Sequence, residues 1–286
     1  MPYAVVVGVD GSEPSTAAAE WAAQEAYRSG RPLRLLHAGD ASSPAPGEAD
    51  RGDEPLPPSV LATRDHIASV LPGLELTCEH VPGNPADALV AAGGRNDLLV
   101  LGSRGLGGFA GLLVGSVSLR VVGHANCPVV VVRAGAEGQD GGAEDVVLGL
   151  DSDQACPDVI AFAFEQAAAR GATLRVLESQ KVPAGPYSAE GVVYQPEVRE
   201  ALEAGELMRL QEALAPWREK HPEVRVQAEL TAWSAGRALV EASRSACLTV
   251  VGRRRPRLHP AAPWLGSVAH AVLHHAHSPV AVVPHD

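Results

Sequence analysis

Glycine and serine residues follow an apolar run near the middle of the first half at a spacing suited to holding an anion. The strand-like run 98–101 is followed by Gly-Ser-Arg-Gly at 102–105. After nine intervening residues comes Gly-Ser-Val-Ser at 115–118, which opens a helical stretch. Glycine allows positive φ angles and a close approach of the backbone to an anion, and a helix N-terminus adds unpaired amides and a positive dipole end. The serine hydroxyls add donors, and Arg104 is the nearest charge for a triphosphate. The segment predicts a main-chain binding site for a polyphosphate.

Two better-known phosphate loops are excluded by the residues that are missing. The Walker pattern needs Gly-Lys-Ser/Thr, but lysine occurs only at 181 and 220. The run 105–110 mimics a dinucleotide fingerprint, yet it follows a late strand and lacks the acidic residue that binds a ribose. Ser12, Ser116 and Ser118 have no histidine and aspartate at motif spacing, so a hydrolase triad is not supported.

The elements around this segment alternate between apolar runs and alanine-rich stretches, which predicts an open, mostly parallel five-stranded α/β sheet with helices on both faces. Ser12 is expected to cap a helix that carries Pro14 in its first turn and ends at Gly30. Ligands of such sheets bind outside the carboxyl ends of the strands, where the strand order reverses. The expected strands of the first half are 4–10, 33–38, 76–81, 98–102 and 129–133.

The second half of the chain repeats the first. Val-Val-Val-Gly-Val-Asp at 5–10 recurs as Val-Val-Leu-Gly-Leu-Asp at 146–151, and further blocks follow in the same order. Collinear blocks indicate a tandem duplication of one α/β domain. The glycine-rich, polar residues 135–143 predict a flexible linker between a first domain at 1–134 and a second domain at 144–286.

The sequence resembles the universal stress protein family, specifically its ATP-binding branch, whose pattern is Gly, two residues, Gly, nine residues, then Gly-Ser/Thr. Residues 102–116 match without gaps, and both halves share the resemblance. It implies an adenine nucleotide alpha hydrolase-like fold duplicated in tandem, with ATP as the ligand, with or without Mg²⁺. Gly8, Val9 and Asp10 would lie beside adenine and ribose, and Ala38 and Leu101 would line the base pocket. Ribose and phosphates would be held by Gly102, Arg104, Gly105, Gly115, Ser116, Val117 and Ser118.

The second copy departs from this pattern. It keeps Asp151, Gly252, Gly266 and Ser267, but Arg255 replaces the second glycine and ten residues, not nine, precede Gly266. A side chain at 255 obstructs close approach of the backbone, so loss of the site is expected. Prolines at 256, 260 and 263 stiffen the loop. Its arginines, at 253, 254, 255 and 257, could bind another anion, although a solvated basic loop is the simpler interpretation.

Composition narrows the remaining choices. The net charge of -11 disfavours a nucleic-acid partner, and no apolar run reaches the length of a membrane span. The first residues lack a secretory signal, so a cytoplasmic location is expected. Cys78, Cys127, Cys156 and Cys247 are scattered singly and are interpreted as free thiols.

Three residue choices keep a structural alternative beside the functional one. Asp10 could bind the ligand or only cap a turn, and Trp21 is interpreted as a core or interface residue. His270, His274 and His277 have a helical spacing that could present imidazoles to zinc, but nothing completes a ligand set, so an incidental solvated cluster is favoured.

The leading hypothesis is a regulatory stress-response protein that binds ATP without strong catalysis. The alternatives are a slow ATP hydrolase or nucleotidyl-transfer enzyme and a structural dimerisation module whose sites stay empty. The expected partners are an adenine nucleotide and an unidentified signalling partner. The last strands, 129–133 and 280–283, could pair within one chain as a pseudo-dimer, which leaves a homodimer open.

Overall fold

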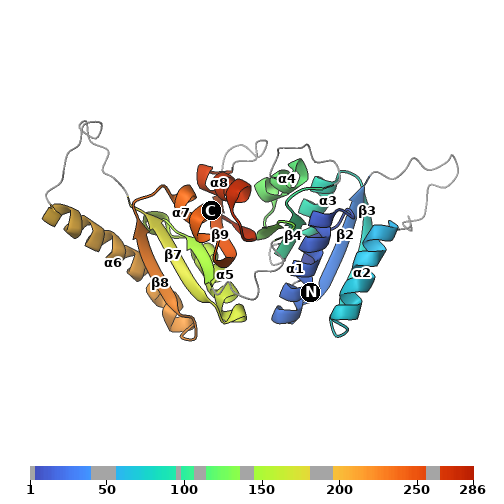
Figure 1. Cartoon of the computed structure of the whole chain (residues 1–286), viewed down its shortest axis with the longest axis horizontal. Helices are drawn as coiled ribbons and strands as arrows, with labels where there is room; N and C mark the ends of the chain where they lie inside the picture. The colour runs from blue at the N-terminus through green and yellow to red at the C-terminus, as the bar shows by residue number, and fades with distance from the viewer. Residues whose placement is uncertain are drawn as a thin grey trace.

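The two halves of the chain share one continuous sheet, with helices on both faces (Figure 1). The computed structural model describes residues 4–39, 56–94, 98–105, 114–135, 145–180, 196–255 and 265–286. Apart from Gly135, the predicted linker lies outside the described residues, so the domain bounds stay a prediction. None of the described helices has both the length and the apolar run needed to cross a bilayer.

Each half contributes five parallel strands, as the apolar runs predict. The first domain holds β1 (Val5–Gly8), β2 (Leu33–Gly39), β3 (Leu76–Pro82), β4 (Leu98–Gly102) and β5 (Val129–Val132). The second holds β6 (Asp145–Gly149), β7 (Thr173–Ser179), β8 (Val226–Thr231), β9 (Ala246–Arg254) and β10 (Val280–His285). The order is β3-β2-β1-β4-β5-β10-β9-β6-β7-β8, so each domain has the same internal order.

The two domains join where β5 and β10 run antiparallel, with Val131 opposite Val280 and Val129 opposite Val282. All the other paired strands are parallel. The last strands therefore pair within the chain, which is the pseudo-dimer that the sequence left open beside a homodimer.

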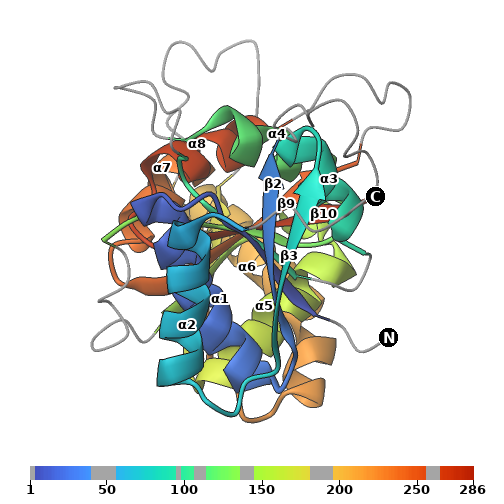
Figure 2. The same ribbon diagram turned by 90° about the vertical axis from the view of Figure 1, so that its right-hand side faces the viewer.

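The helices form two layers. One layer comprises α1 (Glu13–Ser29), α2 (Pro58–Val70), α5 (Pro157–Arg170) and α6 (Pro196–Lys220). The other comprises α3 (Pro85–Ala92), α4 (Ser116–His124), α7 (Ala235–Ala242) and α8 (Ser267–His275). Figure 2 shows α3, α4, α7 and α8 in the upper part of the view and α1, α2, α5 and α6 in the lower part. A separate core of buried residues lies on each side of the sheet, so both faces of the central strands are covered.

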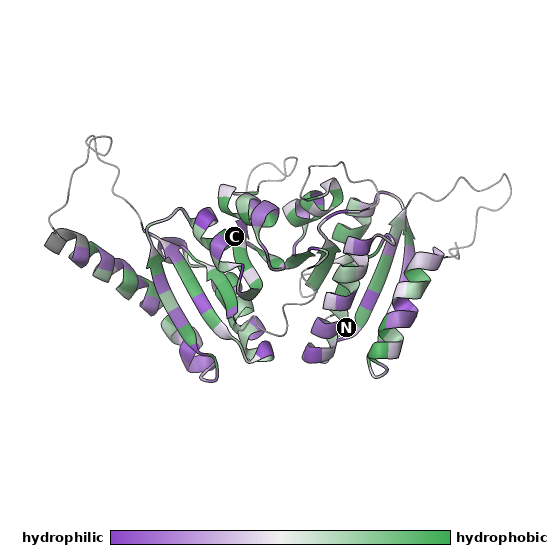
Figure 3. Ribbon diagram, viewed as in Figure 1, coloured by the Kyte–Doolittle hydropathy of each residue, from purple (hydrophilic) through white to green (hydrophobic). Residues whose placement is uncertain are grey.

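The valine-rich strands follow from this two-sided burial. Val5 and Val7 pack into one core and Val6 into the other, which explains why β1 is apolar without alternation. Figure 3 shows the strands largely in green, with hydrophilic residues spread over the helices. The bounds of α1 confirm the capping prediction: Ser12 Oγ accepts from Ser15 N at 3.3 Å, and Gly30 ends the helix at φ 64°.

A buried charge cluster joins α1 to α5 across the domain boundary. The Glu25 side chain is only 4% exposed and accepts from Arg170 Nη2 at 2.7 Å and from Gln166 Nε2 at 2.9 Å. Arg28 also pairs with Glu25, at 3.0 Å. The Arg170 guanidinium lies 5.6 Å from the ring centre of Trp21. Trp21 is therefore an interface residue, as expected.

Replacing Glu25 tests how much this cluster holds the domains together. Glu25→Ala leaves Arg170 and Gln166 without their acceptor, and breaking a buried ion pair typically costs about 3–5 kcal/mol. The expected result is a clearly lower urea midpoint. Glu20→Ala on the same helix removes only an exposed pair with His66 and should cost less than about 1 kcal/mol. Equal effects of the two variants would contradict a stabilising role for the cluster.

Candidate functional site

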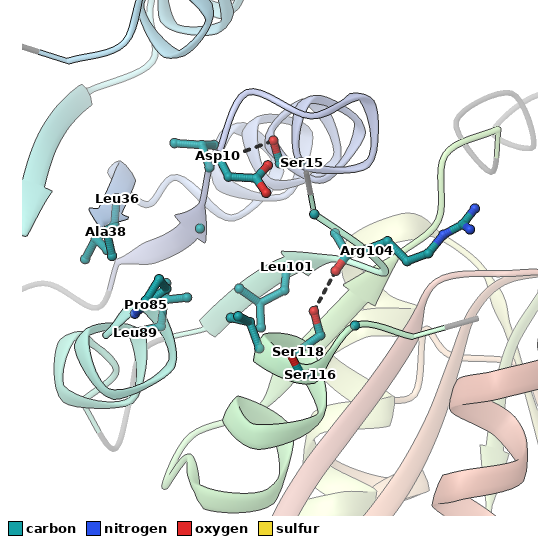
Figure 4. Close-up of a pocket in the computed structure, with 16 residues that line it drawn as sticks. Asp10, Ser15, Leu36, Ala38, Pro85, Leu89, Leu101, Arg104, Ser116 and Ser118 are labelled. Carbon is teal, nitrogen blue, oxygen red and sulfur yellow. Dashed lines mark hydrogen bonds between the residues drawn. The ribbon is translucent and has the colours of Figure 1, made fainter. Parts of the chain in front are cut away.

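One cavity of about 530 Å³ opens where the strand order of the first domain reverses, between β1 and β4. It lies beyond the carboxyl ends of these strands, which is where open α/β sheets bind ligands. All twelve residues chosen from the sequence line it, as Figure 4 shows for those that it labels. Four further residues also line it: Ser15, Leu36, Pro85 and Leu89.

The four additional residues have traceable signals in the sequence. Leu36 lies two positions before Ala38 on the same strand, so the twofold period of a strand places both on one face. Pro85 and Leu89 come from α3, which begins after the Gly-Asn-Pro turn. Ser15 lies in the first turn of α1. From the sequence it is explained as part of the helix start, so nothing indicates that it also lines the cavity.

One end of the cavity is apolar. Leu36 and Ala38 from β2, Leu89 from α3 and Leu101 from β4 face one another there, with Val9 after β1. Gly8 has no room for a side chain, because a Cβ atom would lie 2.8 Å from Leu101 and 3.0 Å from Leu89. The absent side chain lets these leucines meet over the end of β1.

Asp10 marks the polar side of the cavity. Its Oδ1 accepts from Ser12 N at 3.0 Å and from Ser12 Oγ at 2.6 Å, while its own amide donates to Ser15 Oγ at 3.3 Å. Asp10 therefore stabilises the turn into α1, which is the structural alternative considered for it. Its Oδ2 lies against Gly105, so it also lines the cavity, and the two roles coexist.

The glycines of the motif are needed for space rather than for backbone angle. None of Gly102, Gly105 and Gly115 has a positive φ, so the freedom of glycine to take such angles is not used here. A Cβ atom at Gly102 would lie 2.6 Å from the carbonyl oxygen of Pro14, so this glycine lets the start of α1 approach the end of β4. At Gly105 a Cβ atom would collide with the Asp10 carboxylate.

The N-terminus of α4 forms the opposite wall from the apolar end. Gly115 is its N-cap at φ -76°, and no side chain caps the helix, so the amides of residues 116–118 begin it at the cavity. Gly115 N donates to Ser103 O at 2.7 Å, which ties the helix start to the end of β4. Such amides and the helix dipole favour an anion.

The Ser118 hydroxyl differs from the expectation. It donates to Gly102 O at 2.8 Å and is buried, so its proton is used to join α4 to β4 (Figure 4). Ser118 can therefore offer an anion its main-chain amide, but the hydroxyl proton is already engaged. The exposed Arg104 side chain extends away from Asp10. Burial, followed by the nearby Arg104 charge, holds the pKa of Arg133 below its usual value.

The second domain builds the corresponding place differently. Strand β9 continues to Arg254, and Arg253 and Arg254 pair with Pro284 and His285 of β10 instead of entering a loop. The His285 ring lies against Gly252, where a Cβ atom would be 3.0 Å from it. Helix α5 also begins later after its aspartate than α1 does, behind a 3-10 turn at Ser152–Gln154. A different cavity of about 480 Å³ results.

The interpretation of the arginines as a solvated basic loop is wrong for Arg253. This residue is 4% exposed and contacts the first domain, because the extension of β9 carries it into the domain interface. Arg255 Nη1 pairs with Asp286 at 3.0 Å. Only Arg254 is exposed as expected, and Arg257 and the prolines at 256, 260 and 263 lie outside the described residues.

The histidines of α8 do not assemble into a metal site. The His270 and His274 rings stack with 4.4 Å between centroids, and His277 is exposed. Burial, the neighbouring His270 and His275, and Arg133 lower the pKa of His274. Within the described ranges, no three His, Cys, Asp or Glu side chains gather to hold a metal ion. None of the four cysteines, all of which lie in the described ranges, forms a disulfide with another.

Comparison with known proteins gives a consistent result. A family model described as the universal stress protein family matches residues 2–133 and 143–284. A universal stress protein of Mycobacterium tuberculosis is 33% identical over 293 residues, which cover 98% of this chain and 96% of its own. One of Mycolicibacterium smegmatis is 31% identical over 300 residues, which cover 98% and 97%. A solved universal stress protein from Archaeoglobus fulgidus shares the fold, with a TM-score of 0.65, 16% identity and 98% of both chains covered.

Two alanine substitutions separate the glycine that shapes the fold from the one that does not. Gly102→Ala forces the start of α1 away from β4 and should lower the free energy of unfolding by about 1–3 kcal/mol. Gly115→Ala meets nothing closer than 3.5 Å at an ordinary φ, so it should cost only the preference for glycine over alanine at an N-cap, about 0.5–1 kcal/mol. Urea denaturation measures both. A Gly102→Ala variant as stable as Gly115→Ala would refute the packing role.

Proposed function

This chain belongs to the universal stress protein family, and we propose that its first domain binds ATP and that occupancy of the site regulates the protein's partners in a stress response. One observation carries the proposal: a single cavity joins an apolar end to an uncapped helix N-terminus. A nucleotide has the same two parts, a flat base and a polyanionic tail. The volume of about 530 Å³ lies within the usual range for small-molecule sites.

The apolar end suits the adenine ring. Leucines from β2, α3 and β4 surround a space that begins at Gly8, and Ala38 leaves room beside them. Most of the contact a nucleobase makes in such a pocket is apolar, and a few polar groups fix its orientation. Asp10 lies on the α1 side of the cavity, and its carboxylate can accept from the ribose hydroxyls of a nucleotide.

The phosphate end relies on main-chain donors. The amides at 116–118 and the adjoining glycine backbone at Gly105 and Gly115 leave no side chain in the way of phosphate oxygens. Arg104 supplies a cation at the rim of the cavity. Asp10 is the carboxylate of the site, and Mg²⁺ in nucleotide sites is commonly held by one or two carboxylates together with the phosphates.

Regulation, rather than turnover, fits the side chains present. The Ser15 hydroxyl donates to Ser12 O at 2.9 Å and Ser118 to Gly102 O, so neither is an activated nucleophile. Among the described residues that line the cavity there is no lysine and no histidine. Phosphoryl transfer depends on cations and a positioned base at the γ-phosphate. The free thiols fit a reducing compartment, and we place the protein in the cytoplasm.

Calorimetric titration with ATP is the direct test. We expect one ATP per chain for the wild type, because the second domain has Arg255 and a paired β9 where the first has its glycine backbone. Gly105→Arg places the second domain's residue beside Asp10 and should weaken binding at least about 30-fold, roughly 2 kcal/mol.

Gly73→Arg is the matched control, since it introduces the same side chain at a glycine with nothing within 4 Å. Its ATP affinity should equal that of the wild type. Two ATP per chain would contradict the division of roles between the domains. A wild type that stays empty at saturating ATP would reject the proposed function and favour the structural dimerisation module.

Phosphate release distinguishes the binding protein from a slow hydrolase. With ATP and Mg²⁺, the wild type is expected to release phosphate no faster than the Gly105→Arg variant, because no described residue that lines the cavity is an activated base. Asp10→Ala serves as the second comparison, since Asp10 is the carboxylate that a hydrolase would use. Magnesium-dependent turnover that Asp10→Ala abolishes would establish the enzymatic alternative instead.

A further inference from the structure

Helix α4 connects the nucleotide cavity to the second domain. Its N-terminus lines the cavity, and its carboxyl end is bound by a side chain from the other half of the chain. Arg253 Nη1 donates to Gly123 O at 2.9 Å, and Arg253 Nη2 donates to Ala125 O at 2.6 Å. These two carbonyls belong to the last turn of α4 and its C-cap. One guanidinium therefore completes the end of this helix from across the domain boundary.

Arg253 is held in place by its own strand. It pairs in register with Pro284 of β10, and by the repeat of the two halves it stands where the first domain has Ser103. The neighbouring Arg255 Nη2 donates to Asn126 O at 3.4 Å, just beyond α4. Both arginines thus reach the same turn of the first domain. The residues that interrupt the second glycine motif are reused as contacts to the first domain.

The guanidinium of Arg253 is buried, so its charge needs hydrogen-bond acceptors within the protein. Arg253 is 4% exposed, and burial, then the charge of Arg255, lower its pKa. Arginine nevertheless keeps its charge in proteins. It donates to the main-chain carbonyls of Gly123 and Ala125 at the negative end of a helix dipole, where a cation is favoured. If the guanidinium moved, it would lose these hydrogen bonds while still buried, which is unfavourable. The contact therefore fixes the position and direction of α4.

A second contact crosses the interface in the opposite direction. Arg133, at the end of β5, donates from Nη2 to Leu273 O in the last turn of α8 at 2.8 Å. Burial and then the charge of Arg104, which lines the nucleotide cavity, lower the pKa of Arg133. Each domain therefore supplies an arginine to the end of a helix in the other.

We infer that Arg253 of the second domain is a positioning residue for the phosphate end of the first domain's nucleotide site, acting through α4. By holding the carboxyl end of the helix, it aims the amides at 116–118 into the cavity, and its charge adds to the favourable potential along the helix axis. The inference rests on the proposed nucleotide binding and goes beyond it. It gives the second domain a function, as the fixed support of a site that it no longer contains.

The inference predicts a phosphate-dependent effect. In the full chain, Arg253→Met should raise the dissociation constant for ATP about fivefold to tenfold, since the amides at the helix start are no longer held in line. The constant for adenosine, measured by competition against ATP, should change less than about twofold, because the apolar end of the cavity does not touch α4's last turn. Arg253→Lys can still donate to the carbonyls, so its dissociation constant for ATP should lie between those of the wild type and Arg253→Met.

Arg254→Met is the matched control, because it removes the same type of side chain from the next residue, which is exposed. Its affinities for ATP and adenosine should equal those of the wild type. Thermal melting establishes that each variant is folded, and Arg253→Lys provides the comparison if Arg253→Met does not fold.

Three outcomes overturn the inference. If folded Arg253→Met binds ATP as tightly as the wild type, the phosphate end of the site does not need Arg253. If only Arg253→Lys folds, an ATP affinity equal to that of Arg254→Met leads to the same conclusion. Equal weakening of ATP and adenosine shows general structural damage instead of positioning. A wild type that binds no ATP rejects the proposed function, and the inference with it. Selective weakening of ATP, with partial rescue by lysine, supports both.

Discussion

The site depends on the absence of a side chain at Gly102. Two helices begin where β4 ends: the main chain of α1 lies against the Gly102 Cα, while the Ser118 hydroxyl of α4 donates to the Gly102 carbonyl. Both helix starts are thereby brought to one strand end, on opposite faces of the sheet. Their distance from each other sets the width of the cavity, and Asp10 and Gly105 close it from the side of α1. The proposed anion site would therefore rely on backbone packing, with side-chain charge contributed only by Arg104 at the rim.

The second domain keeps the corresponding glycine but uses its space differently. The His285 ring lies against Gly252, α5 starts later, and β9 extends through the residues that would begin the glycine loop. The extension converts Arg253 from a loop residue into a strand residue, and alternation along the strand then directs it into the interface, whereas Arg254 is exposed. Loss of one binding geometry and gain of a domain contact are thus the same structural change. A tandem chain can tolerate it because the other copy retains the first geometry.

Local chemistry explains which features could be predicted from the sequence. The strands and the caps of α1 depend on apolar runs, Ser12 and Gly30, all near in sequence, and all were located within a few residues. The twelve cavity residues were expected from the resemblance to the universal stress protein family, and of these only the segment at 102–118 also follows from glycine spacing, which acts through the main chain. Arg253 could not be placed, because its acceptors are carbonyl oxygens 130 and 128 residues earlier, and a carbonyl leaves no mark in residue type. Neither the proton direction of Ser118 nor the negative φ of the motif glycines has a sequence signal.

Pairing of β5 with β10 also limits how further copies could assemble. A strand has two edges, and each of these strands has one edge on its own domain and the other on its counterpart. The edge by which two separate domains could join is therefore used inside the chain, and a second chain cannot add to it without breaking these hydrogen bonds. The open edges of the sheet are β3 and β8, where Arg34 on β2 pairs with Glu79 and Arg175 on β7 with Glu229. Charged side chains at such edges disfavour the addition of a further strand.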